Sequence, residues 1–207
     1  MPAPVVYVVD DDVSVREALE SLIRHSGWQP EIFASADEFL SRPRALTPSC
    51  LILDVALPGL NGLELQQRIA AELQAMPVIF ITGYGDIPTS VRAMKAGAAE
   101  FLTKPFAEDV LLDAVERAIE QSEAALDRHA QVQSLRERYA TLTRREREVM
   151  SLVVSGRLNK QVGSDLGISE ITVKAHRGKM MHKMKARTVA DLVRMATELE
   201  PATAQKG

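Results

Sequence analysis

Residues 49–59 read Ser-Cys-Leu-Ile-Leu-Asp-Val-Ala-Leu-Pro-Gly, an apolar run that ends at the carboxylate of Asp54 and is soon followed by Pro58 and Gly59. A short, continuously apolar run that ends at turn residues predicts a strand buried on both faces, as in a parallel sheet. Asp54 would then emerge at the carboxyl edge of that sheet. Taken alone, Asp54 could equally be a turn residue.

Two other segments repeat this pattern. Residues 4–9 are apolar and run into the acids at 10–12, and residues 100–103 run into Lys104. In open parallel sheets, ligands bind beyond the carboxyl ends of the strands, at the point where the strand order reverses. The residues expected to meet in one crevice there are Asp10, Asp11, Asp54 and Lys104. Asp12 is explained equally well as an acid at a helix N-terminus.

The first 120 residues alternate between apolar runs and segments with helical periodicity. Strands are predicted at 4–9, 31–33, 49–54, 76–82 and 100–103, and helices at 13–23, 36–40, 61–73, 86–96 and from 107 onward. Five such units predict an α/β doubly wound fold with a five-stranded parallel sheet over residues 1–120.

The remaining residues predict a smaller, all-α domain at 141–200. Thr143 followed by Glu146 is a capping box, and Gly167 lies in a tight turn between two helical segments. The four helices are expected at 143–155, 160–166, 169–185 and 188–199, with the turn forming a helix-turn-helix. Residues 121–140 are predicted to be a helical linker, either continuous with the preceding helix or partly frayed, and residues 201–207 a polar tail.

Charge divides the chain at the same place. Residues 1–120 carry 9 Lys and Arg against 18 Asp and Glu, whereas residues 121–207 carry 16 against 10. An acidic first half favours a cation site, and a basic second half favours a polyanion such as DNA. The single cysteine, Cys50, excludes an internal disulfide. Because neither an N-terminal leader nor an apolar run of membrane-spanning length is evident, we expect a cytoplasmic protein without a membrane partner.

The clustered carboxylates indicate a particular chemistry. Three acids within a few ångströms repel one another and would hold protons unless a cation is bound. Oxygen ligands with water completing the shell suit Mg²⁺ better than Zn²⁺. With Lys104 also neutralising phosphoryl oxygens, the Asp54 carboxylate could attack phosphorus and form an acyl phosphate.

Residues 1–120 resemble a response-regulator receiver domain, which has a flavodoxin-like fold. The matching motifs are Val9-Asp10-Asp11, Leu53-Asp54, Ile81-Thr82-Gly83 and Lys104-Pro105-Phe106. The resemblance implies that a sensor histidine kinase phosphorylates Asp54. It also implies that Asp11, Asp54 and the backbone carbonyl of Ala56 ligate Mg²⁺, with Asp10 acting through water.

The same resemblance assigns switch residues. Thr82 would donate its hydroxyl to the phosphoryl group, Phe101 would be the aromatic ring that rotates, and the Lys104–Pro105 peptide would be cis. Taken alone, Thr82 is explained by a strand-end cap and Phe101 by an ordinary core ring. The surface expected to change and to form a homodimer on phosphorylation includes Ile87, Val91 and Lys95.

Residues 141–199 resemble the LuxR-type helix-turn-helix. The motifs are Leu142-Thr143-Arg144-Arg145-Glu146-Arg147-Glu148-Val149, Gly156, Asn159-Lys160 and Ser169-Glu170-Ile171-Thr172-Val173-Lys174-Ala175-His176. Together with Gly83-Tyr84-Gly85-Asp86-Ile87-Pro88, they make the chain similar to the FixJ-like branch of the NarL/LuxR response regulators. This resemblance covers the chain apart from its linker and tail.

The helix at 169–185 has two faces at about 100° per residue. The inward residues are Val173, His176, Met180 and Met184. The opposite face is small and basic, which suits the major groove. Expected DNA contacts are Lys160, Thr172, Lys174, Ala175, Gly178 and Lys179, of which Lys160 and Thr172 contact the backbone. Gly163 and Gly178 each weaken their helix by roughly 1 kcal/mol relative to alanine.

The last helix carries more apolar residues than a short helix needs. Leu192 and Ala196 are candidates for pairing two DNA-binding domains over a two-fold operator. The alternative is that this helix forms only the fourth wall of a small core.

The sequence therefore predicts a transcriptional regulator rather than an enzyme, with promoter DNA as its partner and RNA polymerase as a candidate further partner. An alternative is a DNA-binding regulator controlled by protein interaction without phosphorylation. A haloacid-dehalogenase phosphatase needs an acid where Ala56 stands, and a dinucleotide-binding loop needs a glycine where Pro88 stands.

Overall fold

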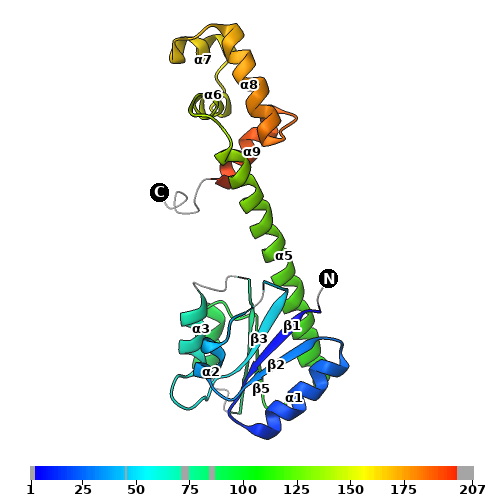
Figure 1. Cartoon of the computed structure of the whole chain (residues 1–207). Coiled ribbons are helices and arrows are strands. Elements are labelled where there is room, and N and C mark those ends of the chain that lie inside the picture. The colour runs from blue at the N-terminus through cyan, green and yellow to red at the C-terminus, as the bar shows by residue number, and fades with distance from the viewer. Residues whose placement is uncertain (1–2, 45, 71–74, 84–86, 200–207) are drawn as a thin grey trace. The chain divides into compact units, whose positions relative to one another are not determined.

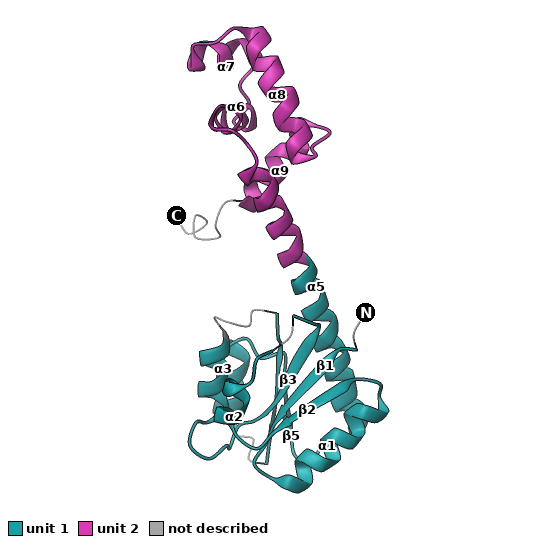
Figure 2. Ribbon diagram, viewed as in Figure 1, with its two compact units in different colours: residues 1–127 teal, residues 128–207 magenta. Residues whose placement is uncertain are grey.

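The computed structural model describes the chain except for residues 1–2, 45, 71–74, 84–86 and 200–207. Figures 1 and 2 show two compact units, residues 1–127 and 128–207. Residues 84–86 of the motif at 83–88 lie outside the described residues, and so does the whole of the predicted tail at 201–207.

The first unit is built on a parallel sheet with strand order β2-β1-β3-β4-β5. The strands are β1 Val5–Val9, β2 Gln29–Phe33, β3 Ser49–Asp54, β4 Val78–Thr82 and β5 Glu100–Thr103. Every residue of β1, β3 and β4 is buried, as expected for strands covered on both faces. The predicted α/β doubly wound fold is confirmed.

Helices cover both faces of this sheet (Figure 1). They are α1 Val13–His25, α2 Ala36–Ser41, α3 Gly62–Ala70, α4 Ile87–Lys95 and α5 Glu108–Ala140. Helices α2, α3 and α4 pack on one face, against alternate strand residues such as Tyr7 and Leu53. Helices α1 and α5 pack on the other face, against the intervening residues such as Val8 and Ile52. Two separate apolar cores, one on each face of the sheet, thereby fix the strands at whose ends the predicted acids lie.

Helix α5 is continuous over 33 residues, so the segment predicted to be a linker continues the preceding helix. Ser122 of this helix is fully buried. Its hydroxyl accepts a hydrogen bond from the backbone N–H of Ser49 (2.9 Å) and donates one to the carbonyl of Ala75. A polar residue that interrupts the apolar spacing of the helix therefore satisfies backbone groups where β3 begins and shortly before β4.

The second unit contains α6 Arg144–Val154, α7 Asn159–Leu166, α8 Glu170–Met184 and α9 Val189–Leu199. The predicted capping box of Thr143 and Glu146 is present at α6, and Ser169 caps α8. The last turns of α5 also belong to this unit, because Leu135 is buried in its core and Tyr139 packs against it. The last part of the predicted linker therefore packs into the core of the second unit.

Leu192 does not lie on the surface of the second unit. Its side chain is completely buried in the core of its own unit, with Val149 and Met180. A residue with no exposed surface cannot contact a second copy of the chain, so its assignment to a dimer surface is wrong. The alternative drawn from the sequence, that α9 forms the fourth wall of a small core, agrees with this burial. Ala196 is half-buried against the same core.

No helix in the described part of the chain is both long enough and apolar enough to cross a lipid bilayer. Cys50 is buried within β3, and burial raises the pKa of its thiol to about 12. Cys50 is thus a small residue of the apolar core.

Candidate functional site

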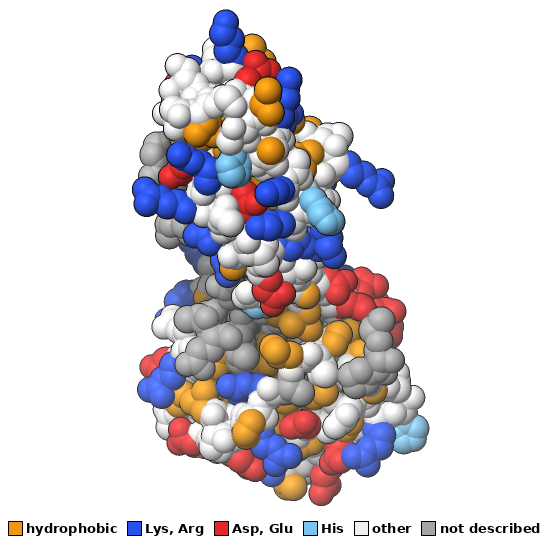
Figure 3. Space-filling model, turned by 45° about the horizontal axis from the view of Figure 1, so that its top comes forward, with side chains coloured by type: hydrophobic (Ala, Val, Ile, Leu, Met, Phe, Trp, Pro, Cys, Tyr) orange, Lys and Arg blue, Asp and Glu red, His pale blue; other side chains and the backbone are white. Residues whose placement is uncertain are grey.

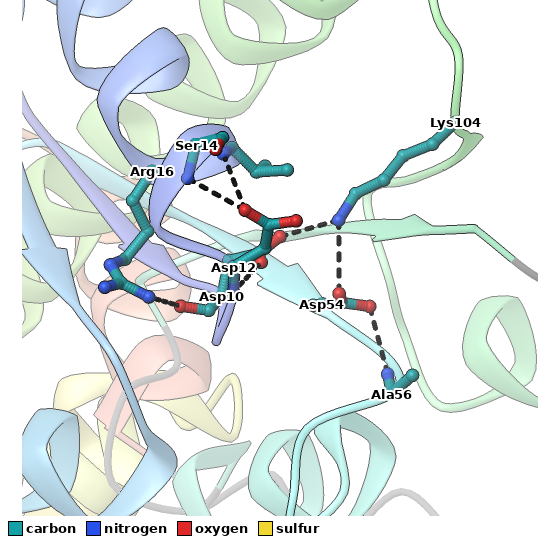
Figure 4. Close-up of polar contacts among 8 residues, drawn as sticks. Asp10, Asp12, Ser14, Arg16, Asp54, Ala56 and Lys104 are labelled. Atoms are coloured by element: carbon teal, nitrogen blue, oxygen red, sulfur yellow. Dashed lines mark hydrogen bonds and ion pairs between the residues drawn. The ribbon is translucent and has the colours of Figure 1, made fainter.

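The acidic residues meet where β1 and β3 end. These strands are neighbours in the sheet and run in parallel, so Asp10, which follows β1, and Asp54, the last residue of β3, emerge at the same edge. Asp10 is fully buried and Asp54 is 7% exposed. Figure 4 shows Lys104, from the segment after β5, reaching toward both carboxylates. The three acids and the lysine that were expected to meet at this end of the sheet therefore lie together.

Hydrogen bonds fix the carboxylates in place. The Lys104 ammonium lies 2.7 Å from an oxygen of Asp10 and 3.1 Å from Oδ2 of Asp54. The other oxygen of Asp54, Oδ1, accepts a hydrogen bond from the backbone N–H of Ala56 (3.0 Å). The other oxygen of Asp10 accepts one from the N–H of Asp12 (2.9 Å). Both carboxylates are thus oriented by donors on two sides.

Burial and charge act against each other at this site. Burial raises the pKa of Asp10, and the hydrogen bond from Lys104 offsets this only in part. For Lys104, burial alone would lower the pKa, but its hydrogen bonds and its attraction to Asp10 and Asp54 outweigh burial, so its pKa is raised. One ammonium therefore does not fully compensate the buried negative charge, and a further cation would be stabilised here.

Three carboxylates are placed to bind such a cation. Asp10, Asp11 and Asp54 each offer an oxygen, and these oxygens lie within 4.8 Å of one another. Asp11 is exposed, so one side of the group is open to water. An all-oxygen group with an open side fits Mg²⁺, which retains several water ligands. Ala56, whose carbonyl was expected to join this group, is an exposed residue in the segment that follows β3.

The switch residues lie on the two neighbouring strands. Thr82 ends β4, the strand beside β3, and is 1% exposed. Phe101 lies opposite Phe80 on β5, half-buried, with the two ring centroids 6.3 Å apart. The Lys104–Pro105 peptide is cis, as predicted. The predicted Asp10, Asp54, Thr82 and Lys104 therefore lie at or just beyond the carboxyl ends of β1, β3, β4 and β5, and Phe101 lies within β5.

Three features of the site refine or extend what the sequence indicated. Asp12 caps α1, accepting hydrogen bonds from the N–H groups of Ser14 and Val15, as the helix-terminus alternative proposed. The guanidinium of Arg16 donates to the backbone carbonyl of Asp10 (2.7 Å) and holds the loop after β1 (Figure 4). A Cβ added at Gly62 would collide with the carbonyl oxygen of Asp54, so α3 begins in direct contact with the end of β3.

The predicted dimerisation residues of the first unit lie on the exposed face of α4. Ile87 is 80% exposed and Val91 43% exposed, and Lys95 is exposed as well. Met94, which was not among the residues predicted from the sequence, adds apolar surface to this face. The face is therefore available to a partner.

The predicted DNA-contacting residues lie in the second unit. Lys160, Thr172, Lys174, Ala175, Gly178 and Lys179 are all exposed. In the face drawn in Figure 3, Lys and Arg side chains gather over this unit. Val173, Met180 and Met184 are fully buried on the opposite side of α8, and His176 is half-buried. The sequence division into an inward face and a basic outward face is confirmed.

The two helix glycines of this unit have different surroundings. A Cβ added at Gly163 would lie 2.7 Å from the carbonyl oxygen of Ile168, whereas one added at Gly178 would meet no atom within 4 Å. Gly163 therefore permits a close approach between α7 and the turn before α8. The prediction that both glycines simply weaken their helices describes Gly178 but omits this packing role of Gly163.

Comparison with known proteins gives matches over both units. The family described as response regulator receiver domain matches residues 6–116, and that of bacterial regulatory proteins, luxR family, matches residues 140–196. The chain is 48% identical to nodulation protein W of Bradyrhizobium diazoefficiens over 195 residues, 94% of this chain and 86% of that protein. It is 39% identical to transcriptional regulatory protein FixJ of the same organism, covering 92% of this chain and 93% of that one.

Solved structures agree with these matches. A low-resolution structure of the response regulator StyR has a TM-score of 0.83 and 44% identity, covering 95% of this chain and 99% of that one. Full-length FixJ from B. japonicum has a TM-score of 0.57 and 38% identity, covering 96% and 98%.

Proposed function

We propose that this chain, which belongs to the response regulators with a LuxR-type DNA-binding domain, is switched by phosphorylation of Asp54 and then binds promoter DNA. The observation that carries the proposal is the ammonium of Lys104 placed between Asp10 and Asp54, at 2.7 and 3.1 Å. Phosphoryl transfer to a carboxylate is favoured by a cation fixed beside it, and here both groups lie at the carboxyl ends of the strands.

Transfer to Asp54 needs few groups. An oxygen of the carboxylate forms a bond to phosphorus while the bond from phosphorus to a histidine nitrogen of the sensor kinase breaks, and that nitrogen keeps the electron pair. The N–H of Ala56 orients the carboxylate through Oδ1. Asp11, Asp54 and the Ala56 carbonyl would hold Mg²⁺, with Asp10 acting through water. When bound, the metal supplies positive charge that neutralises the phosphoryl oxygens.

The phosphorylated chain differs from the unphosphorylated one in the charge at Asp54. The new group adds roughly −1.5 to −2 charge beside Lys104, so the ammonium shifts its hydrogen bonds from the carboxylates to phosphoryl oxygens. The hydroxyl of Thr82 turns toward the same group, and Phe101 fills the space that Thr82 leaves. Because Phe101 is half-buried between the core and solvent, its rotation alters the surface formed by β5 and α4.

That altered surface is the proposed dimer contact, with Ile87, Val91 and Lys95 on α4. Exposed apolar side chains gain free energy on burial, about 25 cal/mol for each Å² of apolar surface removed from water. Sedimentation of the fully phosphorylated chain should give a dimer, and Ile87→Ser should restore a monomer. A monomer in the phosphorylated parent would refute this part of the proposal. Two paired DNA-binding units would then match a two-fold operator.

The test of the proposed function is binding to a selected library of DNA sites, with and without a small-molecule phosphodonor and Mg²⁺. The parent should bind a specific site tightly only with the phosphodonor, and Asp54→Asn should not respond to it. The substitution replaces one carboxylate oxygen by an amide nitrogen, so the shape of the side chain is kept. Equal binding by both proteins would instead favour control by protein interaction without phosphorylation.

A further inference from the structure

Helix α8 exposes an aliphatic side chain at the centre of its basic face. Ile171, in the first turn, is 80% exposed. At about 100° per residue, Gly178 and His182 each fall within about 20° of Ile171 around the helix axis. The buried side of the same helix consists of Val173, Met180 and Met184. Ile171 therefore points directly away from the core, and its exposed side chain does not contribute to core packing in the second unit.

The groups around Ile171 are cationic or small. Lys174, Lys179 and Lys185 are exposed on this face, and Lys174 forms an ion pair with the exposed Glu170 (3.3 Å). Ala175 stands one turn from Ile171 on the same side. The basic edges favour a polyanion over a second protein surface as the occupant. The apolar centre must then meet an apolar group within that polyanion.

In the major groove of DNA, the one apolar group on a base edge is the 5-methyl of thymine. Building on the proposed function, we propose that Ile171, with Ala175 beside it, reads the 5-methyl group of a thymine in the operator. The N-terminal residues of a helix in the groove are the ones that reach base edges, and Ile171 is the second residue of α8. Ile171 was not among the DNA-contacting residues expected from the sequence.

Gly178 makes this reading geometrically easier. It lies two turns beyond Ile171 on the same side of the helix, and a Cβ added there would meet no described atom within 4 Å outside the helix's own backbone and the two adjacent residues. Because Gly178 has no side chain, the helix is thinner at the middle of this face. The helix axis can therefore lie close to the groove floor, which brings the branched side chain of Ile171 into contact with a methyl group.

The test uses full-length phosphorylated protein and the operator selected from the DNA library. Each thymine of the operator is replaced in turn by deoxyuridine, which lacks only the 5-methyl group and keeps the hydrogen bonds of the base pair. The parent should lose about fourfold in affinity at one thymine of each half-site, as expected for one buried methyl group. Ile171→Ala should bind the thymine and deoxyuridine operators equally, and Ile171→Leu should keep the difference.

The matched control is Val193→Ala, which removes an exposed aliphatic side chain (41% exposed) from α9 of the same unit. This variant should discriminate thymine from deoxyuridine as the parent does. An operator that tolerates deoxyuridine at every position overturns the inference and leaves the proposed function intact. Discrimination that persists in Ile171→Ala overturns it as well. If the parent selects no specific site even with the phosphodonor, the proposed function itself fails.

Discussion

Gly163 and Gly178, in the interiors of α7 and α8, are expected to respond oppositely to substitution by alanine. Helix propensity predicts that alanine stabilises both positions by roughly 0.5–1 kcal/mol. At Gly178 nothing opposes this, because the space around an added Cβ is open. At Gly163 the added Cβ would lie 2.7 Å from a backbone oxygen, and α7 or the following turn would have to shift.

We therefore predict that Gly178→Ala raises the free energy of unfolding of the second unit, whereas Gly163→Ala lowers it by about 1–3 kcal/mol. Urea unfolding of the full chain, followed by far-ultraviolet circular dichroism, measures both. Each variant serves as the control for the other, since both make the same change in helix propensity. Stabilisation by both substitutions would show that the contact at Gly163 relaxes without strain.

Individual residues at the acidic site differ in how far the sequence predicted them. Asp10, Asp54 and Lys104 were predictable because strand ends in a parallel sheet converge, and apolar runs reveal where strands end. Arg16 was not, because its position in the sequence is that of any charged residue on the outer side of a helix. Gly62 was not predictable either, since its role depends on a backbone contact with Asp54 that sequence periodicity does not encode.

Among the elements, α5 shows why a polar residue in an apolar spacing can mislead. Ser122 interrupts the helical pattern and weakens a prediction of regular packing. Its hydroxyl is fully used by backbone groups of Ser49 and Ala75, which lie 73 and 47 residues away in sequence. Such a partner becomes visible only when the strands are in place. The same applies to Leu135, whose burial depends on the helices that follow it.

The junction of α6 and α8 combines a predicted and an unpredicted contact. The capping box of Thr143 and Glu146 follows from sequence spacing, but the ion pair of Glu146 with Lys183 (2.6 Å) joins residues 37 apart. Lys183 also donates to the carbonyl of Thr141 (3.1 Å). Burial alone would raise the pKa of Glu146, but the hydrogen bonds from Lys183 and Thr143 outweigh burial, so the pKa is lowered in the folded unit.

This lowered pKa predicts a pH dependence of stability. Because the folded pKa of Glu146 lies below the unfolded value of about 4.3, its contribution is fully present above that pH and is lost as pH falls through the folded pKa. Glu146→Gln keeps the shape of the cap but removes the charge. It should lower the free energy of unfolding of the second unit by about 2 kcal/mol at neutral pH, and the difference from the parent should shrink in acid.

Urea unfolding followed by circular dichroism at several pH values checks this prediction. The single tryptophan, Trp28, packs against the core of the first unit, so its fluorescence reports that unit alone in the same samples. The tryptophan transition should be identical in the parent and in Glu146→Gln. A difference in stability that stays constant from neutral pH to about pH 3 would mean that the charge of Glu146 does not stabilise the fold.

For the whole molecule, the division of charge has a measurable consequence. The net charge of −3 hides an acidic first unit and a basic second unit, and the second exposes cations suited to the phosphates of DNA. Each cation that neutralises a DNA phosphate releases a counterion, so the logarithm of affinity falls with the logarithm of salt concentration, by about 0.9 for each contact. The slope of that line therefore counts phosphate contacts without needing the operator sequence.

We predict that Lys160→Gln lowers this slope by about 0.9, since Lys160 is exposed at the start of α7 and is expected to contact the DNA backbone. The loss of affinity should be the same for the selected operator and for a scrambled site, because phosphates carry no sequence information. Fluorescence anisotropy of the phosphorylated full chain at several salt concentrations gives both quantities. Arg68→Gln, which removes an equal charge from the exposed face of α3 in the acidic unit, should leave the slope unchanged. If the two substitutions change the slope equally, the effect comes from net charge at long range, and Lys160 does not contact a phosphate.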